Sequence, residues 1–142
     1  MDWYKATLEI ATHNKGLLSI THLIESQIKK WGIYEGMCFL FIPHASASLV
    51  INEQYDPTAQ KDLEEKMERL VPDLEPWYQH RMEGSDDSSS HIRSMLTSTS
   101  LSIPIDENHL NLGRWQGVFV FEHRTSGRKR MVYMRCLKVL QA

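Results

Sequence analysis

Apolar residues recur with different periods along the chain, and each period predicts a kind of element. Residues 3–12 alternate between apolar and polar, which is the pattern of a strand with one buried face. Residues 20–31 carry apolar side chains at helical spacing and are followed by Gly32, so a helix that ends there is predicted. The nearly continuous apolar run at 37–43 is typical of a strand buried on both faces, and 49–51 predicts another strand.

A second helix is predicted to begin at residue 57, because Asp56 suits the N-cap and Pro57 the first helical position. Its apolar side chains share one face: Leu63, Met67, Leu70 and Val71. The rest of its surface is charged and is predicted to be a solvated face: Lys61, Asp62, Glu64, Glu65, Lys66, Glu68 and Arg69.

A third helix is predicted from about residue 88, with Ile92, Met95 and Leu96 on its apolar face. The remaining strands are predicted late in the chain, at 101–105, 118–122 and 130–140, with a hairpin bend at 125–127. Pro104 indicates a sheet edge or a bulge.

These elements amount to at least six strands and about three helices, with the antiparallel strands late in the chain. The order predicts the α+β class, with helices packed to one side of the sheets, in a single domain that covers residues 1–142. Alternating βαβ order is missing, so a Rossmann-type sheet is not expected.

Composition narrows the class of function. Sixteen Lys and Arg residues against eighteen Asp and Glu give a net charge of −2, so no positive excess indicates a nucleic acid partner. No apolar run approaches the ~20 residues of a membrane span, and the start of the chain does not resemble a signal peptide. Cys38 and Cys136 lie in apolar runs and are predicted to be buried free thiols. A soluble, cytoplasmic protein is expected, with neither nucleic acid nor membrane as partner.

The most polar stretch, HRMEGSDDSSSH at 80–91, is too polar to fill a core and is therefore a solvated loop or a site. Asp86 and Asp87 suit a helix N-cap, which would place His91 in the first turn, where free N–H groups favour an anion. We expect these amides to face the same pocket as a metal. One aspartate would then cap the helix and the other would bind a histidine or a ligand hydroxyl.

Three of the seven histidines lie at the ends of elements beside small or polar residues: His44, His80 and His91. Three imidazoles with an open position are an established zinc geometry, although the chain contains no local metal motif. The alternative is that these histidines form hydrogen bonds in loops.

Carboxylates near these segments offer acid–base chemistry or ordinary structural roles: Glu53, Asp86, Asp87 and Glu122. Glu122 could instead pair across strands with Arg128 or Arg130. Ser46 and Ser48 follow His44, but no GxSxG motif is present, so they are expected to hydrogen-bond a ligand or the backbone. The basic residues around the hairpin either bind phosphate or are solvated: Arg114, Arg124, Arg128, Lys129 and Arg130.

Six segments carry a resemblance that covers essentially the whole chain. They are PHASASLVINE (43–53), DP (56–57), HRMEGSDDSSSHI (80–92), SLSIPI (100–105), LNLGRWQG (110–117) and FEHR (121–124). In their order and spacing the chain resembles the YjbQ-like family, also called the secondary thiamine-phosphate synthase family. The resemblance implies a compact α+β fold with a β-sandwich core, assembled as a homotrimer.

The resemblance also implies a site. His44, His80 and His91 match the histidines that members are thought to use for a divalent metal, with zinc expected. The other matched positions are Ser46, Ser48, Asn52, Glu53, Asp86, Asp87, Gln116 and Glu122. Among them we expect catalytic roles for Glu53, Asp87 and Glu122 and ligand-binding roles for Ser46, Ser48, Asn52 and Gln116.

The expected function is that of a metal-dependent enzyme acting on a phosphorylated small molecule. Thiamine-phosphate synthase activity, a transferase reaction that releases pyrophosphate, is the example that the resemblance implies. Two alternatives stay open. One is a zinc-dependent hydrolase, which fits a histidine triad better than a magnesium-type synthase does. The other is a non-catalytic trimeric protein that binds a metal or a metabolite.

Overall fold

The computed structural model of the protein describes residues 1–140. Its elements are β1 (Asp2–Ala11), β2 (Asn14–Ser19), α1 (Thr21–Trp31), β3 (Gly36–Phe41), β4 (Ala47–Glu53), α2 (Pro57–Leu70), α3 (Asp87–Leu96), β5 (Ser100–Asp106), β6 (His109–Leu110), β7 (Gln116–Ser126) and β8 (Lys129–Lys138). None of these helices is both long enough and apolar enough to cross a membrane.

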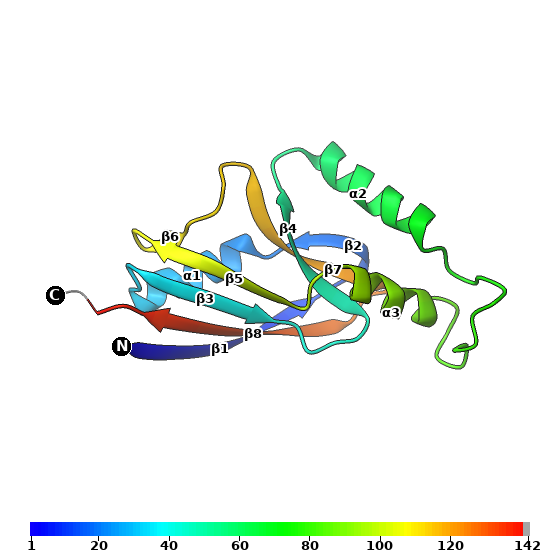
Figure 1. The fold of residues 1–142 in the computed structure, drawn as a ribbon, viewed down its shortest axis with the longest axis horizontal. Helices are drawn as coiled ribbons and strands as arrows, with labels where there is room; N and C mark the ends of the chain where they lie inside the picture. The colour runs from blue at the N-terminus through cyan, green and yellow to red at the C-terminus, as the bar shows by residue number, and fades with distance from the viewer. Residues whose placement is uncertain (141–142) are drawn as a thin grey trace.

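The strands form two sheets (Figure 1). One has five strands in the order β1-β8-β3-β5-β6, and the other has three in the order β2-β7-β4. Every strand pairing within them is antiparallel. The α+β class and the β-sandwich core are thereby confirmed, with three helices as expected. The N-terminus and residue 140 lie together at the end of the molecule that is farthest from α3.

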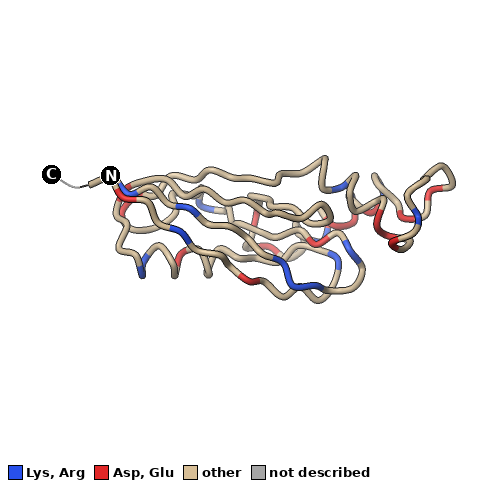
Figure 2. Tube along the Cα trace, turned by 90° about the horizontal axis from the view of Figure 1, so that it is seen from below, with Lys and Arg blue, Asp and Glu red and all other residues tan. Residues whose placement is uncertain are grey.

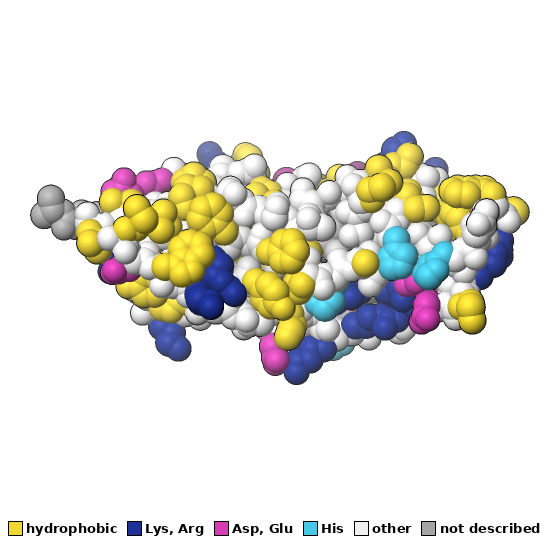
Figure 3. Space-filling view, turned by 60° about the horizontal axis from the view of Figure 1, so that its bottom comes forward, with side chains coloured by type: hydrophobic (Ala, Val, Ile, Leu, Met, Phe, Trp, Pro, Cys, Tyr) yellow, Lys and Arg dark blue, Asp and Glu magenta, His cyan; other side chains and the backbone are white. Residues whose placement is uncertain are grey.

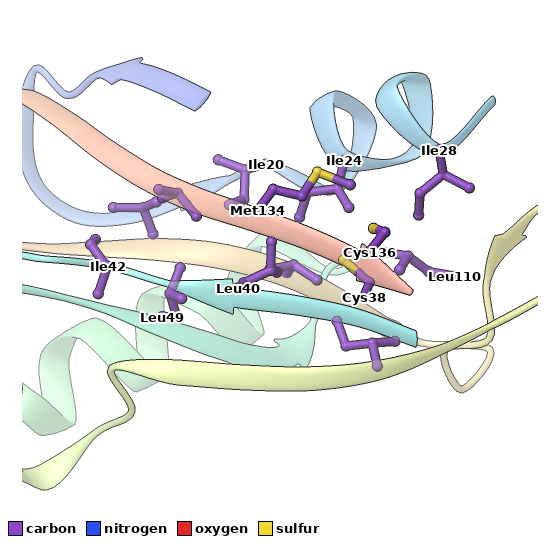
Figure 4. Packing of buried hydrophobic residues seen from close by; sticks show 14 of the residues in the cluster. Ile20, Ile24, Ile28, Cys38, Leu40, Ile42, Leu49, Leu110, Met134 and Cys136 are labelled. Carbon is purple, nitrogen blue, oxygen red and sulfur yellow. The ribbon is translucent and has the colours of Figure 1, made fainter. Parts of the chain in front are cut away.

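The hydrophobic core lies between the two sheets and under α1 (Figure 4). Ile24 and Ile28 are fully buried on the inner face of α1, and Met134 reaches toward them from β8. Cys38 and Cys136 lie opposite each other in β3 and β8 and are both buried and free, which confirms the prediction.

Most strand predictions are confirmed, but β2 and β6 were not predicted. β2 lacks a two-residue period because Gly16 interrupts it, and the register slips between Asn14 and Gly16 where it pairs with β7. The formation of such a strand depends on pairing with its neighbour, here β7, more than on the strand propensity of its own residues. β6 has two residues and pairs only with the end of β5, so β5 is nearly an edge, as Pro104 indicated.

α1 and α2 differ in how they are docked. α1 ends at Gly32 in the left-handed conformation, as predicted, and packs into the core. α2 begins after Asp56, whose Oδ1 accepts from Thr58 N at 2.9 Å, which confirms the predicted cap. However, α2 has no buried residue, and Figure 1 shows it standing at the periphery of the molecule.

The predicted faces of the two later helices are confirmed only in part: Leu63 and Met67 of α2 are half-buried and Val71 is buried. In α2, Glu64 and Glu68 reach across to neighbouring elements, whereas Leu70 is 58% exposed. In α3 the predicted apolar face points outward, and Met95 is 76% exposed. The buried side chains of α3 are polar instead: Asp87, Ser89, Ser90, Arg93 and Ser94. Hydrogen bonds to neighbouring elements make this burial tolerable.

Candidate metal centre

Three side chains from the predicted polar stretch converge at the start of α3. The ligand atoms of His80, Asp87 and His91 all lie within 4.8 Å of one another. Asp87 Oδ2 is 2.6 Å from His80 Nε2 and 3.1 Å from His91 Nε2. The two imidazole rings are 5.4 Å apart and tilted by 41°. Figure 3 shows histidines exposed at one end of a face where basic side chains also gather.

His91 is oriented by a contact on the far side of its ring. Its Nδ1 is 2.9 Å from the carbonyl oxygen of Ala45, in the loop before β4. With Nδ1–H donating to this oxygen, Nε2 is the ring nitrogen on the side of Asp87 and could bind a metal shared with that carboxylate. A backbone acceptor on the second ring nitrogen is the usual arrangement for a metal-binding histidine.

Asp87 is the buried member of the group and serves two sets of partners. Its Oδ2 faces the histidines, and its Oδ1 accepts from Arg124 Nη1 at 2.6 Å. Burial raises the pKa of the Asp87 carboxyl, but the hydrogen bond from His80 and the charges of His91 and Arg124 outweigh burial and leave that pKa below its usual range. Asp87 is therefore ionised at neutral pH and able to bind a cation.

Asp86 connects the start of α3 to the end of β7. Its carboxylate accepts from Arg124 Nε at 3.1 Å and from the backbone N–H of Thr125 at 2.6 Å. Burial raises the pKa of Asp86, and these donors together lower it to about 2. Asp86 occupies the N-cap position, but its side chain makes no capping hydrogen bond, so the predicted cap is corrected. In Figure 2 acidic and basic residues lie close together at this end of the molecule.

The donor set suits a transition metal. Two imidazoles and one carboxylate are a known zinc ligand set, and they leave at least one coordination position open. The side chains of His80 and His91 are 53% and 40% exposed, so that position would face solvent. The Arg124 guanidinium is engaged with Asp86, Asp87 and the carbonyl oxygen of Glu83.

His44, the third histidine of the predicted metal set, is not in the group formed by His80, Asp87 and His91. Its Nε2 accepts from the backbone N–H of Met131 at 2.9 Å, which engages one of its two ring nitrogens with β8. Burial, and then the charge of Arg130, lower the pKa of His44. Asp87, predicted as a catalytic residue, is the side chain that the structure brings together with His80 and His91.

Glu122 and Ser46 anchor the loop behind the site. Glu122 is fully buried and accepts from Arg130 Nε at 2.8 Å, from Thr12 Oγ1 and from Arg124 N, so it has no free face for a ligand. Arg130 Nη2 also donates to Ser46 Oγ at 2.9 Å and to its carbonyl oxygen. This chain of contacts holds the loop whose Ala45 carbonyl faces His91. Glu122, for which a catalytic role was expected, is therefore engaged entirely with protein groups in this structure.

Ser48 lies deeper, in a chain of hydrogen bonds beneath α3. Its Oγ is 2.8 Å from His123 Nε2 and 2.6 Å from Thr97 Oγ1. Both Ser48 and His123 are fully buried. Ser48 therefore supports the packing of α3 on the sheet, and the expected ligand-binding role has no accessible surface.

Three further predicted residues lie at the other end of β4. Ala47, at the end of β4 near His91, pairs with Glu122, whereas Glu53, at the opposite end of β4, pairs with Gln116. Six residues of extended strand, about 20 Å, separate Ala47 from Glu53. Glu53 accepts from the backbone N–H groups of Tyr55 and Asp56. Asn52 and Gln116 likewise bond to nearby backbone amides, of Glu53 and Gly113. The structure does not bring these three residues to the histidine cluster.

A small cavity adjoins the cluster. It measures about 130 Å³ and is lined by His80, Arg81, Gly84 and Ser88 among others. Within residues 1–140 no acceptor is found for the first-turn amides of Ser88 and Ser89. These amides and Arg81 supply hydrogen-bond donors and positive potential beside the candidate metal ligands.

The protein is an antiparallel α+β sandwich with a candidate metal centre, in which two solvent-accessible histidines flank a buried aspartate at the start of a helix. The chain belongs to the UPF0047 YjbQ-like family, whose family model, described as "UPF0047 protein YjbQ-like", matches residues 6–139.

Relatives match over nearly their whole length. The chain is 43% identical over 129 residues to UPF0047 protein sll1880 of Synechocystis, covering 91% of this chain and 88% of that protein. It is 37% identical over 131 residues to UPF0047 protein YjbQ of Escherichia coli O157:H7, covering 92% and 94%. Among solved structures, the conserved hypothetical protein TT1486 of Thermus thermophilus is similar, with a TM-score of 0.84, 34% identity and coverage of 93% and 99%.

Proposed function

We propose that the protein is a metal-dependent enzyme that acts on a phosphorylated small molecule at the cluster of His80, Asp87 and His91. The observation that carries this proposal is the convergence of these three ligand atoms within 4.8 Å, with both imidazoles open to solvent. Zinc is the metal that the ligand types suit best. When bound, it would supply a Lewis acid and a water of lowered pKa.

The protein's own groups would bind the phosphate. Arg81 and Ser88, in the first turn of α3, line the adjacent cavity, and the positive end of the helix dipole adds to their attraction for an anion. Asp86 does not compete for the first-turn amides of α3, because its carboxylate bonds to Arg124 and Thr125. A phosphate could thus approach the cluster without displacing a capping side chain.

Positioning would come from contacts behind the ligands. The Ala45 carbonyl holds the ring of His91, and Arg124 holds Asp87 in a fixed orientation. Glu122 and Arg130 keep the loop of Ala45 in place. Ligands held by a packed, hydrogen-bonded shell need little reorganisation when the substrate arrives.

The donor set favours hydrolysis of a phosphorylated metabolite over thiamine-phosphate synthesis. Synthases that release pyrophosphate generally use magnesium held by carboxylates, whereas this cluster has two imidazoles and one carboxylate. Thiamine-phosphate synthase activity stays the transferase alternative. A non-catalytic protein that binds metal and phosphate is the third candidate.

Turnover assays separate the three. The zinc-loaded protein is incubated with a panel of phosphorylated metabolites, and separately with the pyrimidine pyrophosphate and thiazole phosphate pair, with and without chelator. Phosphate release that chelator abolishes and His80→Ala lacks supports the hydrolase. Pyrophosphate release only when both substrates are present supports the synthase, and no turnover with retained metal and phosphate binding supports the non-catalytic candidate.

A homotrimer is the assembly that we propose, and the outer face of the five-stranded sheet is its contact surface. Aromatic side chains lie on this face, and we call it the aromatic face: Trp3, Phe39, Phe41 and Tyr133. Trp3 is 55% exposed and Phe41 46% exposed, which is unusual for neighbouring aromatic residues. Burial of this face against another copy would remove them from water and protect the outer strands.

A further inference from the structure

A second cavity lies between α2 and the three-stranded sheet. It measures about 410 Å³, which falls in the range of small-molecule sites, and it shares no lining residue with the histidine cluster. Its walls come from β2, α2, α3 and β7, so four elements that are distant in sequence enclose it.

Polar contacts support α2 above this space. Glu64 Oε2 accepts from the backbone N–H of Leu17 at 2.8 Å, and Lys15 Nζ is 3.1 Å from Glu68 Oε1. Gly16 makes the first contact feasible, because a Cβ at that position would lie 2.1 Å from Glu64 Oε2. Glu64 and Glu68 therefore occupy the side of α2 that faces β2. Because these side chains bind β2 through polar contacts, the space between the two elements is not filled by apolar packing.

Arg93 carries the argument for a ligand. Its side chain is buried, with 1% exposure, and it lines the cavity from α3. Nε and Nη2 donate to the Val71 carbonyl oxygen at 3.1 Å and 2.6 Å, and Nη2 also lies 3.4 Å from Asp73 Oδ1 and 3.4 Å from Glu68 Oε2. Nη1 has no hydrogen-bond partner within residues 1–140, and Arg93 is one of the residues that line the cavity. A buried guanidinium with free donors favours an anionic group there.

The other charges decide the class of ligand. The cavity wall carries three cationic and three anionic side chains: Lys15, Lys61 and Arg93, and Glu64, Glu65 and Glu68. An ion of one sign would meet repulsion from half of them, whereas a molecule with both charges can satisfy both sets. Phe121 and Met67 add apolar surface to the same wall.

We propose that this cavity binds a small zwitterion, namely an α-amino acid with an apolar side chain. Its carboxylate would accept from Arg93 Nη1 with Lys61 nearby. Its ammonium group would lie beside Glu64 and Glu65, and its side chain would contact Phe121. The site goes beyond the metal-dependent function proposed above and does not depend on it, because no ligand of the metal lines the cavity.

Titration calorimetry on the full chain tests the site with L-leucine, L-methionine and L-phenylalanine. At least one of them should bind saturably. For the amino acid that binds best, the analogues that lack the ammonium or the carboxylate should bind at least tenfold more weakly (for leucine, 4-methylpentanoate and 3-methylbutylamine). Glu64→Gln and Lys61→Ala should each weaken binding at least fivefold. Lys66→Ala and Asp62→Asn, on α2 but outside the cavity wall, are the matched controls and should bind like the wild type.

Three results would overturn the site. They are no saturable binding of any of the three amino acids, equal affinity for a singly charged analogue, and wild-type affinity in both cavity variants. Glu64→Gln keeps an acceptor for Leu17 N–H, and Lys61 is exposed, so both variants should fold. Treatment with chelator should leave amino-acid binding unchanged even where it removes metal, so failure of this site and failure of the metal site give different results.

Discussion

Asp87 joins the candidate metal centre to the body of the protein, because its two oxygens have different partners. Oδ2 faces the two histidines and Oδ1 accepts from Arg124. Asp87→Asn should keep the acceptor for Arg124 but lose the anionic ligand. We expect zinc affinity to fall by about 100-fold or more, while the free energy of unfolding changes by about 1 kcal/mol.

Competition titration with a zinc chelator and urea unfolding measure these two quantities. Asp62→Asn, on the exposed surface of α2, is the matched control and should change neither. Wild-type zinc affinity in Asp87→Asn would remove Asp87 from the ligand set.

His123 offers a test through pH. It is fully buried, and burial followed by the charge of Arg93 lowers its pKa from 6.5 to about 3. As pH falls below 6.5, His123 becomes protonated in the unfolded state but stays neutral in the folded state, so the free energy of unfolding decreases. The expected slope from this residue is about 1.4 kcal/mol per pH unit.

His123→Gln removes this titration and keeps a donor for Ser48. Urea unfolding between pH 6.5 and 5 should therefore show a shallower loss of stability in His123→Gln than in the wild type. Above pH 7 the two proteins should show no difference in slope. Identical slopes below pH 6.5 would mean that His123 is protonated in the fold.

At the scale of elements, periodicity located the helices but not the side that each turns inward. α1 was predicted with its end at Gly32, and Ile24 and Ile28 of its apolar stripe are buried, whereas Leu23 of the same stripe is exposed. For α3, the buried stripe is polar and depends on partners such as Val71 and Asp73, far away in sequence, that meet Arg93 only in the fold. A pattern rule that assigns polar residues to solvent cannot detect such a network.

The same limit applied to the site. His80, Asp87 and His91 were all singled out from one short stretch, and the four-residue spacing of Asp87 and His91 on a predicted helix was the signal that could have paired them. The contact between Asp87 and Arg124 could not be predicted from the local sequence, because Arg124 belongs to β7, which is distant along the chain. Glu53 was grouped with the site because it lies in a family motif. In the structure, the length of β4 separates Glu53 from the histidine cluster.

The docking of α2 predicts its dynamics. α1 buries Ile24 and Ile28, whereas α2 buries no residue and is held by exposed or half-exposed ion pairs. Local opening of α2 should therefore cost less free energy than opening of α1. Hydrogen exchange followed by NMR should give backbone amides of α2 protection at least tenfold below those of α1. Equal protection in the two helices would contradict this view of α2.

At the scale of the whole molecule, the proposed homotrimer would be held together by the aromatic face. Phe41→Asp should convert a homotrimer into monomers, because a charge in the centre of an apolar contact is not compensated. Light scattering at micromolar concentration measures the mass. Leu23→Asp, which changes an exposed leucine on α1, is the control and should stay trimeric. A monomeric wild type, or a trimeric Phe41→Asp variant, would rule out this assembly.

The central claim is that His80, Asp87 and His91 bind one divalent metal, and zinc stoichiometry after exhaustive dialysis tests it most directly. Mass spectrometry of the metal content should give one zinc per chain in the wild type and in His22→Ala. It should give close to none in His80→Ala and His91→Ala, because three protein ligands leave no spare donor. His44→Ala should retain zinc, since the structure holds His44 apart from the cluster. Full zinc content in His80→Ala, or its loss in His44→Ala alone, would contradict the account.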